Sequence, residues 1–176
     1  MSTQSKSWML AAACAALLAG AARSDTAVTT QAVSEPERWS VGLMVGDPFG
    51  ITAKRYLGRD AVDLDLGLAY GPGLRFGADY LWGLAQLTPG SSTLGLVLYL
   101  GAGPFVGALE RPCGPFFGDR CAGGGVYLGG RMPLGLEMIF RKAPVAVGLE
   151  IAPALAFAPG GAGFLIDALL TARVLL

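Results

Sequence analysis

The segment Gly124–Phe140 reads GGVYLGGRMPLGLEMIF and is largely apolar, yet it contains Arg131 and Glu137 with Pro133 between them. A helix would lose a backbone hydrogen bond at Pro133, which disfavours a helical structure. In an extended strand, by contrast, successive side chains point to opposite sides of the backbone. One side of this segment would then be almost entirely apolar, while the other would carry both charges among small residues. The segment therefore predicts a β-strand with an apolar face and a small, polar face.

Seven further segments show the same alternation, and clusters of Gly, Pro and Asp separate them. In the third of them, leucines at every second position share one face, whereas Asp63 and Asp65 share the other face with Gly67. The eight predicted strands are Trp39–Val45, Gly50–Leu57, Ala61–Tyr70, Gly73–Leu84, Ser92–Gly103, Gly124–Phe140, Ala143–Ala158 and Gly163–Leu176. Short connections between successive strands predict an antiparallel, up-and-down arrangement.

The two faces of the predicted strands differ in the size of their side chains. The apolar faces carry Leu, Ile and Phe, while the opposite faces consist mainly of Gly and Ala with charges of both signs. A sheet face in contact with water usually carries Lys, Glu, Thr and Ser in quantity. The small faces are therefore predicted to line the crowded lumen of a narrow barrel. The charges predicted to point into this lumen are Lys54, Asp63, Asp65, Arg75, Asp79, Arg131, Glu137, Glu150, Asp167 and Arg173.

Large apolar side chains on the outside of a barrel indicate contact with lipid. A sheet in lipid must close, because an open edge leaves backbone groups without hydrogen bonds. Strands of about 9–11 residues cross the hydrocarbon layer, and eight is the smallest common number in bacterial barrels. We therefore expect an all-β fold, an eight-stranded antiparallel up-and-down transmembrane β-barrel over residues 39–176. Arg55 is the exception on the outer face, near a strand end from which its side chain could reach the interface.

Two other architectures fit parts of the sequence. A helical membrane protein is disfavoured because the uncharged stretch from Leu81 to Leu109 contains Pro89, Pro104 and six glycines. A soluble barrel of lipocalin type would place the apolar faces inside, and the abundance of Gly and Ala on the opposite faces argues against it.

The composition limits the classes of function. The formal net charge is zero, so the chain lacks the basic surface expected of a nucleic-acid-binding protein. The chain contains no His, which removes the commonest general base and the commonest metal ligand. We therefore expect neither an enzyme nor a protein with a metal or cofactor. Catalysis by a carboxylate pair, or an enzyme acting on lipid, stays open as the weaker alternative.

The N-terminal residues 1–24 have the features of a secretory signal peptide. Lys6 precedes an apolar stretch from Trp8 to Leu18, and small residues suited to cleavage follow it. The apolar stretch is short for a transmembrane helix, which needs about 20 residues. Cys14 could instead indicate a lipoprotein, but it lies in the middle of the apolar stretch. Residues 25–38 are polar and predict a periplasmic linker.

The remaining cysteines, Cys113 and Cys121, lie in the longest predicted connection, residues 104–123. An even pair of cysteines in an exported protein indicates a disulfide. If both termini lie in the periplasm, this connection faces the outside of the cell, where long loops of such barrels are found. The disulfide could simply staple the loop. It could also present Phe116 and Phe117 to a partner at the cell surface.

Four segments together resemble the small eight-stranded outer-membrane barrels of OmpA/OmpX type, and more narrowly a bacterial family of such barrels. They are Gly50–Tyr56 (GITAKRY), Asp79–Trp82 (DYLW), Gly129–Gly135 (GGRMPLG) and Glu150–Pro153 (EIAP), and the similarity runs from Val41 to the C-terminus. The resemblance implies the fold and a location in the bacterial outer membrane, with the assembly machinery of that membrane as a partner. Such barrels usually end in an aromatic residue, whereas this chain ends in Leu176.

These observations predict a barrel whose lumen is filled by paired charges. Buried ions need partners because their desolvation costs several kcal/mol each. Four cations and six carboxylates could form a plug, and the surplus carboxylates are expected to be protonated or to lie at a barrel mouth. Pro133 is expected to mark a bulge or a broken register. We expect a monomeric protein in outer-membrane lipid with a structural or surface-interaction role, or alternatively a narrow channel or small-ligand-binding barrel.

Overall fold

A computed structural model of the chain describes residues 37–69, 73–88, 91–109, 125–158 and 161–176. The predicted signal peptide, all but the last two residues of the predicted linker, and both Cys113 and Cys121 lie outside the described residues. Among the described residues, no helix has the length and apolar character needed to cross a membrane.

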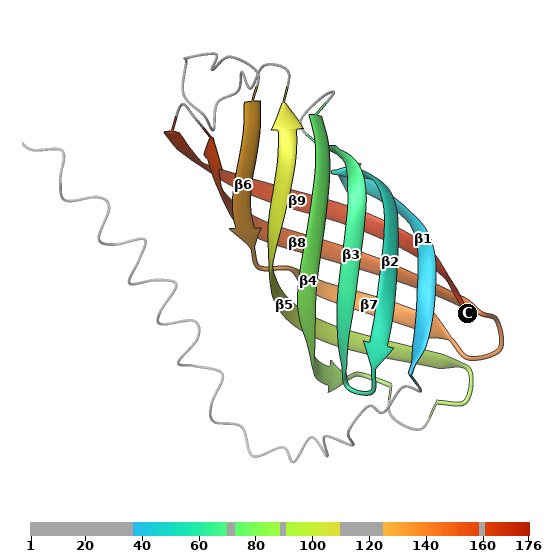
Figure 1. The fold of residues 1–176 in the computed structure, drawn as a ribbon. Coiled ribbons are helices and arrows are strands. Elements are labelled where there is room, and N and C mark those ends of the chain that lie inside the picture. Colours follow the sequence, from blue (N-terminus) through green and yellow to red (C-terminus); the bar gives the residue numbers. More distant parts are fainter. Residues whose placement is uncertain (1–36, 70–72, 89–90, 110–124, 159–160) are drawn as a thin grey trace, which may run out of the picture.

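The described residues form nine antiparallel β-strands (Figure 1). They are β1 (Arg38–Asp47), β2 (Phe49–Leu57), β3 (Asp60–Ala69), β4 (Gly73–Gln86), β5 (Leu94–Leu109), β6 (Gly125–Arg131), β7 (Leu134–Phe140), β8 (Val145–Ala158) and β9 (Gly161–Leu175). Pairing follows chain order from β1 through β5, and β8 pairs with β9. The first and last strands also pair, from Ser40 opposite Leu175 to Asp47 opposite Ala168. The result is an all-β, up-and-down sheet whose strands follow one another around a ring.

The ring has eight positions because β6 and β7 share one of them. Each of these two strands pairs with β5 on one side and with β8 on the other. Arg131 lies opposite Ala154 and Leu134 lies opposite Ile151, so the register is the same before and after Pro133. The predicted bulge or broken register at Pro133 is therefore wrong. Pro133 divides the predicted strand without shifting it, because proline has no N–H to donate to the neighbouring strand.

Several predicted boundaries also change. β5 continues to Leu109, so residues 104–109, predicted as the start of the long loop, belong to a strand instead. Its continuation is explained by backbone pairing with β6, where Phe105 lies opposite Gly129. The β4–β5 pair contains a register shift between Gly83 and Ala85 on β4. The sequence pattern did not predict this irregularity.

Along most of each strand, side chains alternate between the inside and the outside of the ring. On β9, residues from Gly163 to Leu175 alternate between buried and exposed at every step. Glycines on the inner face make room for aromatic rings from the neighbouring strand. A Cβ atom at Gly135 would collide with the ring of Tyr99, which lies opposite it on β5. The interior is thus close-packed rather than open.

Candidate functional site

The candidate site is the interior of the ring, where the ten charged residues predicted from the sequence lie. All ten are buried, with exposed fractions between 0% and 5%. They come from β2, β3, β4, β6, β7, β8 and β9, because each occupies an inward position in its strand. None of the six carboxylates lies at an exposed mouth, so that part of the expectation about surplus carboxylates is wrong.

Arg131 on β6 organises one group of charges. Its Nε donates to both carboxylate oxygens of Asp79, at 2.9 and 3.2 Å, and its Nη2 contacts Asp65 and Asp79. Its Nη1 lies 3.5 Å from a carboxylate oxygen of Asp167 on β9. Asp167 in turn binds the guanidinium of Arg75 through both of its oxygens, with Nη1 donating at 3.0 Å. We call these five residues the Arg131 cluster.

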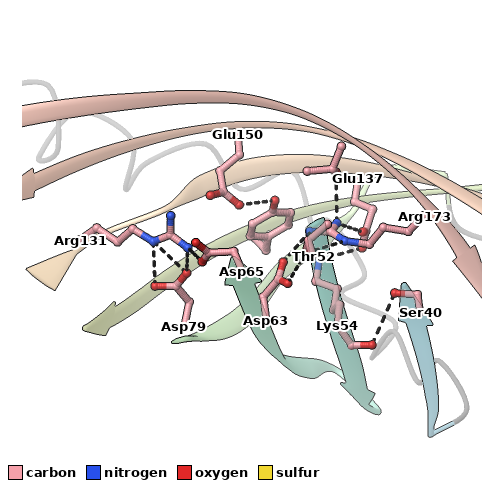
Figure 2. A network of polar contacts seen from close by, with 12 residues as sticks. Ser40, Thr52, Lys54, Asp63, Asp65, Asp79, Arg131, Glu137, Glu150 and Arg173 are labelled. Atoms are coloured by element: carbon pink, nitrogen blue, oxygen red, sulfur yellow. Dashed lines mark hydrogen bonds and ion pairs between the residues drawn. The ribbon is translucent and has the colours of Figure 1, made fainter. Parts of the chain in front are cut away.

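Arg173 on β9 organises the second group, which Figure 2 shows beside the first. Its Nη2 donates to Asp63 at 2.5 Å, and its Nη1 donates to Glu137 at 3.0 Å. Lys54 donates to the other oxygen of Glu137 at 3.1 Å. The hydroxyl of Thr52 donates to Asp63 at 2.7 Å and accepts from Arg173 at 3.0 Å. These five residues form the Arg173 cluster.

Glu150 lies between the two clusters in Figure 2 and has a different kind of partner. The hydroxyl of Tyr99 donates to its Oε2 at 2.8 Å. Within the described part of the chain, no lysine or arginine forms an ion pair with it. Glu150 is therefore the surplus carboxylate, because each of the other five contacts an arginine or a lysine.

The ion pairs connect strands that are not neighbours in the ring. Lys54 on β2 reaches Glu137 on β7, and Arg131 on β6 reaches Asp65 on β3. Arg75 on β4 similarly reaches β9. Because these contacts cross the interior, they hold opposite walls together and occupy the space between them.

Apolar clusters lie on both sides of the charges. Toward the end where β1 begins and β9 ends, which we call the terminal end, the inner side chains include Tyr56, Leu81, Tyr99, Ile139 and Leu175. Toward the opposite, distal end they include Phe105, Tyr127, Ala154, Ala156 and Leu165. A cavity of about 30 Å³ opens at the terminal end and is lined partly by Lys54 and Glu137. That volume holds only one or two water molecules.

Aromatic side chains in the interior contact the buried cations. The sequence analysis did not assign these aromatic residues a role. Lys54 Nζ lies 4.5 Å from the centre of the Tyr99 ring, and the Arg75 guanidinium lies 4.3 Å from that of Phe105. These are cation–π distances. Tyr99 could have been found because the alternation places it on the small, polar face. Phe105 was missed because its segment was predicted to be a loop.

The outer face is the opposite of the interior in chemical character. Thirty large apolar side chains of the described residues are exposed there and at the strand ends. Exposed aromatic side chains occur near both ends of the closed sheet. Near the terminal end they are Trp39, Tyr80, Trp82 and Phe140, and near the distal end they are Phe49, Phe76, Phe157 and Phe164. The sequence analysis did not predict these two rows, although the alternation alone would have placed each ring outward.

The described residues contain no group of three or more His, Cys, Asp or Glu side chains arranged to hold a metal ion. The acidic side chains of both clusters instead face arginine or lysine. Within the described residues, the carboxylates of both clusters are therefore paired with cations of the same interior. Comparisons of the chain with protein-family models, with curated proteins and with solved structures found no match.

Proposed function

We propose that this protein is an integral β-barrel of the bacterial outer membrane, with a lumen plugged by charge pairs and a structural or surface-interaction role. The observation that carries the proposal is the inversion of the usual distribution: charges are buried and large apolar side chains are exposed. The largest apolar patch of a soluble monomer is typically about 300–600 Å². The thirty exposed large apolar side chains of the described residues, most of them on the outer face, make a far more extensive apolar surface, and lipid is the solvent that suits it.

The dimensions of the strands support membrane insertion. Apart from β6 and β7, which together fill one place in the ring, the shortest strand is β2 with 9 residues and the longest is β5 with 16. A tilted transmembrane strand needs about 9–11 residues. The two rows of exposed aromatic rings match the belts that flank the apolar band of outer-membrane barrels. Pairing of β1 with β9 also leaves neither strand with an open edge, as a bilayer requires.

The contents of the interior support a plug rather than a pore. Each cluster spans the ring, and apolar side chains pack on either side of the charges. The cavity of about 30 Å³ at the terminal end is too small for an organic ligand, since ligand pockets measure about 300–1,000 Å³. The alternative of a narrow channel or small-ligand-binding barrel therefore has less support than the plug.

The proposal is tested by expressing the full chain with its own N-terminal segment and fractionating the cells. We expect the protein in urea-washed outer membranes, with a gel mobility that changes on boiling. Reconstituted in planar bilayers, it should show no defined single-channel conductance. Recovery as a detergent-free periplasmic protein would overturn membrane insertion, and regular conductance steps would overturn the plug while leaving insertion intact.

A further inference from the structure

A groove of about 430 Å³ lies on the outer face of β1–β4, the strands that run side by side in Figure 1. It is lined by Ala53 on β2, a small residue where neighbouring outward positions carry large ones. Leu43, Ile51, Leu66 and Phe76 form its walls, and all four are more than a third exposed. If a methylene occupies about the volume of a water molecule, roughly 30 Å³, the groove accommodates on the order of ten methylenes. An acyl chain has this size and this chemistry.

A pair of opposite charges lies beside the groove, toward the terminal end. Arg55 follows Ala53 by two positions on β2, which places the two residues about 7 Å apart along the strand. The Arg55 side chain is 48% exposed, and its Nη2 lies 3.8 Å from Glu37 Oε2, whose side chain is 72% exposed. The guanidinium also lies 5.7 Å from the centre of the exposed Trp39 ring. An exposed, loosely held ion pair of this kind can exchange partners at little cost.

We propose that this face binds one phospholipid with an ethanolamine headgroup, its acyl chain in the groove and its headgroup on Arg55 and Glu37. The guanidinium fork of Arg55 matches phosphate oxygens. Glu37 accepts hydrogen bonds from the primary ammonium, which a quaternary choline cannot donate. A glycerol headgroup presents no cation to Glu37. Trp39 lies where amphipathic rings mark the boundary between acyl chains and headgroups.

This inference rests on the proposed membrane insertion, so the experiment first separates the two. The purified full chain is mixed with vesicles and floated on a density gradient. A protein that fails to float with vesicles refutes the proposed function, and the lipid site with it. Protein that inserts is then extracted in mild detergent and analysed by native mass spectrometry with equal amounts of ethanolamine, choline and glycerol phospholipids of one chain length.

For inserted protein we expect one retained lipid, with ethanolamine preferred over the other headgroups by about three- to fivefold, the size of effect of one exposed charged contact. Glu37→Gln should abolish the preference over choline while choline lipid still binds. Ala53→Phe should remove the retained lipid by filling the groove. Ala168→Phe, at an exposed position on the outer face of β9, is the matched control and should retain it.

Each variant must show the same boiling-dependent gel shift as the parent, so that loss of lipid is not loss of the fold. Equal retention of all three headgroups, or lipid retention unaffected by Ala53→Phe, would overturn the lipid site while the proposed membrane insertion stands. A preference for the glycerol headgroup would likewise overturn the assignment of Glu37 as an ammonium acceptor.

Discussion

Replacing Arg131 with Met should destabilise the folded protein by about 3–5 kcal/mol, the cost of breaking a buried ion pair by removing one partner. Arg131 contacts Asp65, Asp79 and Asp167, and its side chain is 3% exposed. Without it, the three carboxylates of the Arg131 cluster face a single remaining cation, Arg75. Methionine restores much of the lost volume, so the effect reports charge rather than a cavity.

The same geometry predicts a rescue. The triple variant Arg131→Met/Asp65→Leu/Asp79→Leu leaves Arg75 paired with Asp167 and removes the stranded carboxylates. Its stability should return to within about 2 kcal/mol of the parent, because apolar replacements of a whole buried charge group are often neutral or stabilising. The control is Arg141→Met, at an exposed turn position, which should change stability by no more than about 0.5 kcal/mol.

Stability would be measured by urea titration of protein folded in detergent micelles, with the boiling-dependent gel shift and tryptophan fluorescence as independent probes. The result that refutes the reasoning is an Arg131→Met variant as stable as the Arg141→Met control. Such a result would mean that the Asp65 and Asp79 carboxylates are not paired with Arg131 in the folded protein. A triple variant less stable than the single one would instead refute the independence of the Arg75–Asp167 pair.

Three further predictions concern other parts of the fold. Leu134→Arg places a charge on the exposed outer face and should cost about 2–4 kcal/mol in vesicles; a harmless substitution would contradict lipid contact there. Gly135→Leu forces a side chain into the ring of Tyr99 and should cost about 1–3 kcal/mol in the same titration, whereas unchanged stability would indicate a loose interior. Cys113 and Cys121 should resist alkylation until reduced, and their disulfide should contribute roughly 2–3 kcal/mol to stability. Free thiols in unreduced protein would contradict the disulfide.

The period-two alternation was enough to predict most of each strand and to place its charged side chains inside, although not every strand boundary. It requires only that neighbouring side chains point to opposite sides, so Lys54 and Glu137 could be placed inside without any knowledge of their pairing. The pairing itself could not be predicted. Which cation meets which carboxylate depends on the register of β2 against strands on the far side of the ring, and the sequence of one strand carries no information about that.

Backbone hydrogen bonding explains why the predictions at Pro133 and at Phe105 were wrong. Pro133 was expected to disturb the register, but Gly101 N still donates to its carbonyl at 2.7 Å, and Met132 N donates to the Pro153 carbonyl at 3.0 Å. These bonds keep the chain in line across the missing donor. Phe105 was assigned to a loop because the long connection was predicted to begin at residue 104, yet Pro104 lies opposite Gly130 in the β5–β6 pair. Proline is tolerated in the strand at that position, and the Phe105 ring packs edge-on against Tyr127, with 6.0 Å between the ring centres.

The seam between β1 and β9 has a consequence for how the molecule is assembled. β9 supplies Asp167 to one cluster and Arg173 to the other, and it also covers the edges of β1 and β8. Until this last strand docks, both clusters contain unmatched charges and two strand edges lack hydrogen-bond partners. In the proposed membrane setting, an intermediate that lacks β9 would therefore be unfavourable, because lipid cannot satisfy free backbone groups. We therefore expect closure of the seam and neutralisation of the interior to occur together.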